Sequence, residues 1–251
     1  MLNRVLDFFR ARDRSALPYD GQPDFAVVLA DFPVLERLDE LRRARLLECA
    51  AEILRRKSFV GGSGYTPSRE DCLSVAMLAA LPILERGLTW YDDFQTFVLY
   101  PDAFVADLEE IDEDGLVHSG PDLRVGEAWN RGPVILAMSD VRASGQGEGF
   151  NVVVHELAHQ IDHRNGEANG FPLLPQDMAP ERWTQVFSQA YDRLLSELDR
   201  GAEPGLDPYA AESPAEFFAV ASECFFDDPD WLHEAHPALH EQLKTLYGYS
   251  L

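Results

Sequence analysis

Two histidines and a glutamate form a His-Glu-x-x-His run at His155, Glu156 and His159, inside the stretch NVVVHELAHQIDH. On a helix, residues four positions apart lie about 40° apart around the axis, so both imidazoles face the same side. Two imidazoles at this spacing are a common ligand pair for Zn²⁺. Glu156, beside the first ligand, is placed to take a proton from a water molecule that the metal activates. The run therefore predicts two zinc ligands and a general base on one helix.

The residues around this run indicate a buried helix. Asn151 is suited to cap its N-terminus, and Asn165-Gly166 to end it. Buried imidazole and carboxylate groups need partners, and a metal ion would provide them. The alternative interpretation is an ordinary amphipathic helix that carries two histidines and a glutamate, but apolar residues surround the run on most sides. The apolar residues that surround the run are Val152, Val153, Val154, Leu157, Ala158 and Ile161.

The third protein ligand must come from elsewhere in the chain. A metzincin would supply it from position 165 as histidine, after glycine at position 162, but this chain has Asp162 and Asn165. The best region is the acidic and apolar stretch LDPYAAESPAEFFAVASECFF, residues 206–226. Within it Glu216 is a candidate ligand, yet it also has the position of a capping-box acid.

Two other acids in this stretch keep the assignment open. Glu212 and Glu223 are rival ligands, and spacing alone does not decide between them and Glu216. Glu223 follows Glu216 by about two helical turns, so it is placed to contact a ligand histidine instead of the metal.

Several segments together resemble the Mlc titration factor A family of zinc peptidases, whose catalytic core is similar to that of anthrax lethal factor. The resemblance covers roughly residues 20–245. The segments that carry it are HELAHQIDHRNG, YAAESPAEFFAVASE, KSFVGG (57–62), LTWYDDFQTFVLYPDAF (88–104) and GEAWNRGPVILAMSDV (126–141).

The resemblance implies one Zn²⁺ held by His155, His159 and Glu216, with Glu156 as general base. It also implies that Tyr209 assists the transition state, although the run Asp207-Pro208-Tyr209 by itself is typical of a packed turn. The implied activity is peptide hydrolysis on a peptide or protein substrate, reported mainly as aminopeptidase-like. Some family members bind a glucose-responsive transcription repressor. The alternative is therefore a regulatory binding protein that sequesters such a repressor, with structural zinc or vestigial activity.

The sequence predicts an α+β fold, a helix-rich zincin-like metallopeptidase core with a small mixed or antiparallel sheet. We expect an N-terminal arm over residues 1–20 and a single domain over residues 21–251. Apolar periodicity and capping residues predict helices over residues 34–57, 68–86, 179–198, 214–226 and 237–247. Residues 95–100 and 133–139 are expected to be strands, and the acidic residues 108–115 an exposed turn between strands.

The overall composition restricts the partners. A net charge of −23 and a pI of about 4.5 oppose binding to nucleic acid or to an anionic membrane. The N-terminal residues lack the pattern of a signal peptide, and no segment reaches the length of a membrane span. Cys49, Cys72 and Cys224 are without metal-binding spacing and are expected to be small buried residues in a reducing compartment. We therefore expect a cytoplasmic protein.

Three further histidines lie near the C-terminus. His233, His236 and His240 belong to the segment WLHEAHPALHEQLK, which has the pattern of a surface helix. A structural or solvent-exposed role is favoured for them over a second metal site.

Overall fold

The computed structural model describes residues 23–102, 107–111, 117–121 and 132–251. The arm predicted over residues 1–20 lies outside these residues, as do GEAWNR of the fifth matching segment and residues 112–115 of the predicted acidic turn. Residues 108–111 of that segment form a strand, so the prediction of a turn was wrong for them. In the described part of the chain, helices predominate over two small sheets, which confirms the α+β class. None of the described helices is both long and apolar enough to cross a membrane.

The main sheet consists of three short strands, β1 (Ser58–Gly61), β2 (Thr96–Tyr100) and β5 (Val134–Ala137), in the order β1-β2-β5. Both pairings are parallel, so the prediction of a mixed or antiparallel sheet was wrong for this sheet. The reason is the connection: α4 (Arg69–Ala80) lies between β1 and β2 and returns the chain to the edge where β1 began. Among the residues that the structure describes, antiparallel pairing joins β3 (Asp107–Ile111) and β4 (Val117–Pro121) in a separate two-stranded sheet.

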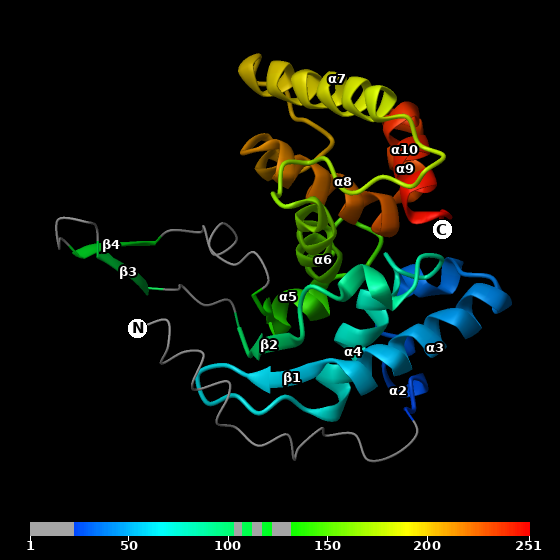
Figure 1. The fold of residues 1–251 in the computed structure, drawn as a ribbon, viewed down its shortest axis with the longest axis vertical. Coiled ribbons are helices and arrows are strands. Elements are labelled where there is room, and N and C mark those ends of the chain that lie inside the picture. The colour runs from blue at the N-terminus through cyan, green and yellow to red at the C-terminus, as the bar shows by residue number, and fades with distance from the viewer. Residues whose placement is uncertain (1–22, 103–106, 112–116, 122–131) are drawn as a thin grey trace.

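The N-terminal helices form the lower part of the molecule together with the main sheet (Figure 1). After α2 (Ala26–Leu29) and the 3-10 turn η1 (Pro33–Arg37), the long helix α3 (Glu40–Arg56) packs on α4. A capping box begins α4: the Ser68 hydroxyl accepts from the Asp71 amide, and the Asp71 carboxylate accepts from the Ser68 amide. The helix is shorter than predicted, and the 3-10 turn η2 (Leu88–Tyr91) precedes β2.

The next helices carry the His-Glu-x-x-His run. Strand β5 ends where α5 (Met138–Ala143) begins, a few residues earlier than predicted. Helix α6 (Val152–Asp162) follows, with the 3-10 turn η3 (His163–Asn165) at its end. The Asn151 side chain accepts a hydrogen bond from the amide of Val154 at 3.1 Å, which confirms the predicted N-cap. Because α6 packs on α4, α5, β5 and α8, it lies between the two halves of the molecule (Figure 1).

The C-terminal half is helical and forms the upper part in Figure 1. Its elements are α7 (Pro180–Asp199), the 3-10 turn η4 (Pro208–Ala211), α8 (Pro214–Asp227), α9 (Pro229–Ala235) and α10 (Pro237–Tyr247). The three helices predicted here are confirmed to within a residue at each end. Aromatic side chains join them, since Trp183 and Phe187 of α7 pack against Phe218 of α8.

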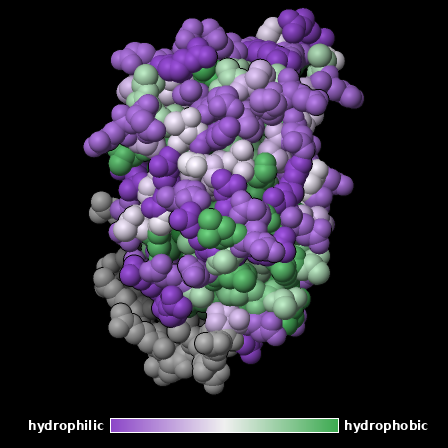
Figure 2. Space-filling model, turned by 90° about the vertical axis from the view of Figure 1, so that its right-hand side faces the viewer, coloured by the Kyte–Doolittle hydropathy of each residue, from purple (hydrophilic) through white to green (hydrophobic). Residues whose placement is uncertain are grey.

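The surface is consistent with the acidic composition. On the face drawn in Figure 2, hydrophilic residues cover most of the area and hydrophobic residues gather in the lower part. The core beneath is continuous and includes nearly all of α4 and α8. The burial of Cys72 and Cys224 agrees with their prediction as small buried residues, while Cys49 is half-buried; all three thiols are free.

Candidate metal centre

Three predicted ligands converge at one point between α6 and α8. The Nε2 atoms of His155 and His159 lie 3.2 Å apart. The Oε2 atom of Glu216 lies 3.1 Å from Nε2 of His155 and 3.3 Å from Nε2 of His159. We refer to His155, His159 and Glu216 as the ligand triangle.

The ligand triangle has the dimensions that Zn²⁺ requires. When Zn–ligand bonds of ~2.0–2.1 Å meet at the tetrahedral angle, the ligand atoms lie about 3.3 Å from one another. The three observed separations, 3.1, 3.2 and 3.3 Å, agree with this value. Two imidazoles and a carboxylate are also a donor set that zinc favours, so the residues fit the ion in both distance and chemistry.

The orientation of His155 is fixed from behind by Glu223 of α8. Its Nδ1 atom lies 2.6 Å from Oε1 of Glu223, so Nδ1 carries the proton and Nε2 is left to face the centre of the triangle. The other carboxylate oxygen of Glu223 accepts from the Asn151 amide at 2.7 Å. Glu223 is therefore not a rival ligand, and it orients His155 as its spacing from Glu216 indicated.

Glu216 reaches the triangle from the first turn of α8. The Ser213 hydroxyl caps the helix by accepting from the Glu216 amide at 3.1 Å. Unlike Asp71 in α4, Glu216 does not complete a capping box, and its carboxylate points at the imidazoles instead. Of the two roles considered from the sequence, the side chain therefore has that of a ligand, and only the backbone amide of Glu216 takes part in capping. Glu212, the remaining rival, is exposed and lies outside the triangle.

The two residues expected to act on substrate lie beside the triangle. Glu156 is half-buried and follows His155 on α6. Tyr209 lies on η4, with its ring centroid 6.0 Å from that of His155. Burial and the nearby acids Glu216 and Glu212 raise the pKa of Tyr209 to about 12, so its hydroxyl keeps its proton at neutral pH.

The histidines and the acids at the triangle shift one another's pKa values. Burial alone would lower the pKa of His155, but the carboxylates of Glu216 and Glu223 outweigh it and raise that pKa to about 10. Burial likewise opposes ionisation of Glu216, yet the two histidines lower its pKa to about 2. A proton on His155 thus compensates the carboxylates until a cation displaces it.

A further acid of α8 was not foreseen as part of this region. Asp227 is fully buried, and its Oδ2 atom accepts from the amides of Gly147 and Gly149 at 3.0 and 2.8 Å. These bonds anchor the loop that leads into α6. The signal in the sequence was the position of Asp227 four residues after Glu223, which places both acids on the same face of one apolar helix.

Asp162 anchors the loop at the other end of α6. It is fully buried, and its Oδ2 atom accepts from the Gly170 amide at 2.6 Å. Gly170 has a φ of +75°, and a Cβ atom there would lie 2.4 Å from the carbonyl oxygen of Pro214, the first residue of α8. The Gly170 carbonyl also accepts from the Trp183 indole at 3.0 Å. The end of α6 is thereby tied to the start of the helix that supplies Glu216.

Comparison with known proteins shows the family of the chain. The family model described as glucose-regulated metallo-peptidase M90 matches residues 10–248. The chain is 40% identical over 219 residues to Mlc titration factor A of Serratia proteamaculans, covering 86% of this chain and 83% of that protein. It is 36% identical over 235 residues to the protein of the same name from Escherichia fergusonii (92% and 88% covered), and 37% identical over 219 residues to that of Salmonella gallinarum (86% and 82% covered). The chain therefore belongs to the M90 metallo-peptidase family, together with the Mlc titration factor A proteins.

Proposed function

We propose that this chain is a zinc-dependent peptidase whose active site is the ligand triangle with Glu156 and Tyr209. The observation that carries the proposal is the mutual spacing of 3.1–3.3 Å among His155 Nε2, His159 Nε2 and Glu216 Oε2. The position of the run on one helix, α6, and membership of a metallo-peptidase family support it.

The residues divide the work of peptide hydrolysis among them. Zn²⁺ held by the triangle would supply Lewis acidity, activating water near neutral pH and polarising the substrate carbonyl. Glu156 removes the proton from the attacking water and later delivers it to the leaving amine. The Tyr209 hydroxyl donates a hydrogen bond to the oxygen of the scissile carbonyl as negative charge develops on it. Glu223 keeps His155 in the tautomer that can bind a metal.

The test uses a panel of amino-acid p-nitroanilides, chosen because we expect aminopeptidase-like activity, together with internally quenched peptides. Hydrolysis should disappear with a chelator and return with Zn²⁺. Glu156→Gln should keep the metal and lose turnover by a factor of about 10²–10⁴, the usual contribution of a general base. Glu212→Gln, which changes an exposed acid outside the triangle, is the matched control. If Glu156→Gln cleaves peptides at the wild-type rate, the proposed base is wrong.

A second function is favoured by the names of the relatives. Proteins at 36–40% identity are called Mlc titration factor A, which points to binding of Mlc, a transcription repressor. We propose that this chain binds such a repressor, either in addition to peptide hydrolysis or in place of it. Size-exclusion chromatography of purified chain mixed with the Mlc protein of the same organism tests this. Zinc-loaded chain that forms the complex but cleaves no peptide would favour a regulatory binding protein.

A further inference from the structure

We propose that the chain has a second zinc site, formed by His233 of α9 with His240 and Glu241 of α10. One ligand atom from each of these residues lies within 4.8 Å of the other two. This set, which we call the α9–α10 cluster, shares no residue with the ligand triangle. It does not depend on the proposed peptidase activity.

The strongest evidence is the state of the His240 side chain. Its exposed fraction is 6%, and its ring packs against Phe225 with centroids 5.3 Å apart. The Nδ1 atom is buried and has no hydrogen-bond partner among the described residues. A buried polar atom without a partner costs about 1–3 kcal/mol, so a ring held in this orientation needs a ligand or a donor that the protein itself does not supply.

His233 and Glu241 place further zinc-ligating groups near Nδ1 of His240. An Oε1 atom of Glu241 lies 3.6 Å from His240 Nδ1, beyond hydrogen-bond distance but near the ~3.3 Å separation of two ligands on one tetrahedral zinc. The rings of His233 and His240 lie 4.9 Å apart at 73°, close to the 4.9 Å and 79° of the two histidines in the ligand triangle. His233 and Glu241 are exposed, so side-chain rotation can close the remaining gap.

The chemistry of the cluster fits zinc at moderate affinity. Two imidazoles and one carboxylate leave a fourth position for water. Burial and the neighbouring His233 lower the pKa of His240, so its ring is neutral at pH 7, the form that binds metal. Lys244 lies 3.7 Å from the same oxygen of Glu241, and this ammonium must move away when an ion binds. We therefore expect weaker binding here than at the triangle, where all three ligands are partly buried and His155 is oriented by Glu223.

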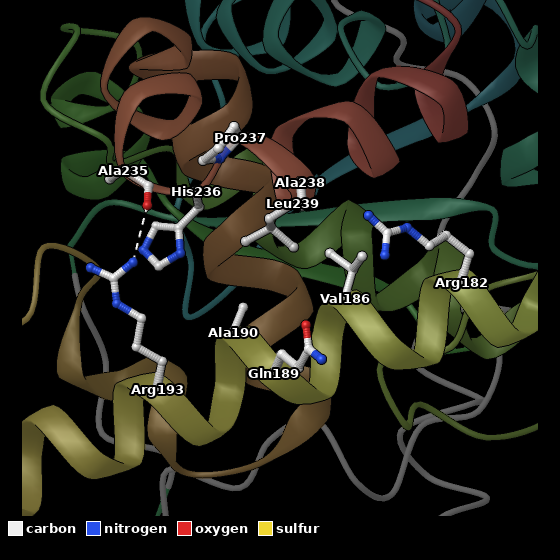
Figure 3. Close-up of a pocket in the computed structure, with 10 residues that line it drawn as sticks. All are labelled: Arg182, Val186, Gln189, Ala190, Arg193, Ala235, His236, Pro237, Ala238 and Leu239. Atoms are coloured by element: carbon white, nitrogen blue, oxygen red, sulfur yellow. Dashed lines mark hydrogen bonds between the residues drawn. The ribbon is translucent and has the colours of Figure 1, made fainter.

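The third histidine of this region belongs to a different environment. Figure 3 shows His236 directed towards Arg193 of α7, beside a pocket of about 220 Å³ between α7 and the junction of α9 with α10. Arg193 donates to the carbonyl oxygen of Ala235 at 3.1 Å. The positive charge of Arg193 opposes a cation at His236, which makes this residue the matched control for His233.

Binding of an ion to the α9–α10 cluster would join two short helices that pack on each other. Because α9 has only seven residues, its position depends on such contacts. Zinc at this cluster should therefore raise the melting temperature beyond the rise produced by the ligand triangle alone.

The test is a count of zinc per chain. Full-length protein is stripped with a chelator, dialysed against ZnCl₂ and measured by elemental analysis, with circular dichroism as a check of folding. Wild type should bind two equivalents, with the second released first as chelator is added. His233→Gln and Glu241→Gln, both at exposed positions, should each lose one equivalent, whereas His236→Gln should keep both.

A variant of the ligand triangle tests from the other side which zinc equivalent belongs to which site. His159→Gln should lose the tightly bound equivalent and keep the weaker one. Wild type that binds a single equivalent at saturation would overturn the proposal. The proposal would also be overturned if His233→Gln and Glu241→Gln both still bound two equivalents of zinc. Loss of the weaker equivalent in His236→Gln would overturn it as well.

Discussion

Substitution of Glu223 by glutamine tests the reasoning about how α8 positions the metal ligands. This side chain is 5% exposed and makes bonds of 2.6 Å to His155 Nδ1 and 2.7 Å to the Asn151 amide. The imidazole and the backbone amide contact different oxygens of Glu223, and glutamine keeps only one of these positions as an acceptor. Its NH₂ group then faces another donor.

The magnitudes follow from these two bonds. Loss of one hydrogen bond to a charged acceptor costs about 1.5–3 kcal/mol, which lowers the melting temperature of the metal-free protein by ~3–12 °C for a chain of this size. Removal of the partner that orients a metal-ligating histidine weakens metal binding by about 10–100-fold. We expect both effects in Glu223→Gln.

Zinc affinity is measured by competition with a chromophoric chelator, and stability by thermal unfolding after exhaustive removal of metal. Glu212→Gln should match wild type in both measurements because Glu212 is exposed and outside the triangle. Zinc affinity within twofold of wild type and an unchanged melting temperature in Glu223→Gln would refute the positioning role.

Three further predictions concern the loops around α6 and the protons of the site. Asp227→Ala should destabilise the protein by about 1.5–3 kcal/mol, seen in urea unfolding, because the amides of the loop before α6, such as Gly149, lose a charged acceptor; a loss below 1 kcal/mol would contradict this. Gly170→Ala should lower both stability and zinc content, because its Cβ would meet the Pro214 carbonyl at a positive φ; an unchanged melting temperature would show that this approach is not needed. The pKa of His155, raised from 6.5 to about 10, stabilises the metal-free protein below pH 6.5, and this contribution is lost as the pH rises towards 10. Zinc binding at pH 7 should accordingly release about one proton, measured by calorimetry in buffers of different ionisation enthalpy, and zero release would contradict the shift.

The local elements were predictable because their signals are short-range. Asn151 and Ser68 cap the helices that their positions indicated, and the apolar runs define most helix ends to within a few residues. The direction of the main sheet was not predictable from its strands, since strands of four or five residues have the same sequence pattern in parallel and antiparallel pairs. The signal was the helix between β1 and β2, which makes a crossover, but β1 itself was too short to be recognised.

In the site, too, local spacing was predictable and contacts between elements were not. Helical spacing indicated that His155 and His159 face one side, whereas the choice of Glu216 over its neighbours depended on family resemblance. Spacing along α8 could not decide which acid meets the imidazoles, because that depends on how two helices cross. The partners of Asp162 and Asp227 are backbone amides of distant loops. Helical spacing places Asp227 on the same face as Glu223, but it does not show which loop either acid contacts.

Helix α8 carries three carboxylates with different roles. Glu216 belongs to the triangle, Glu223 orients His155, and Asp227 binds the loop before α6. A small slide or rotation of this helix would disturb all three together, so metal occupancy and the seating of α8 are thermodynamically linked. Linkage is reciprocal: any molecule that binds more tightly to the zinc-loaded form must increase zinc affinity by the same factor. The ion and a protein partner can therefore sense each other through α8 without touching.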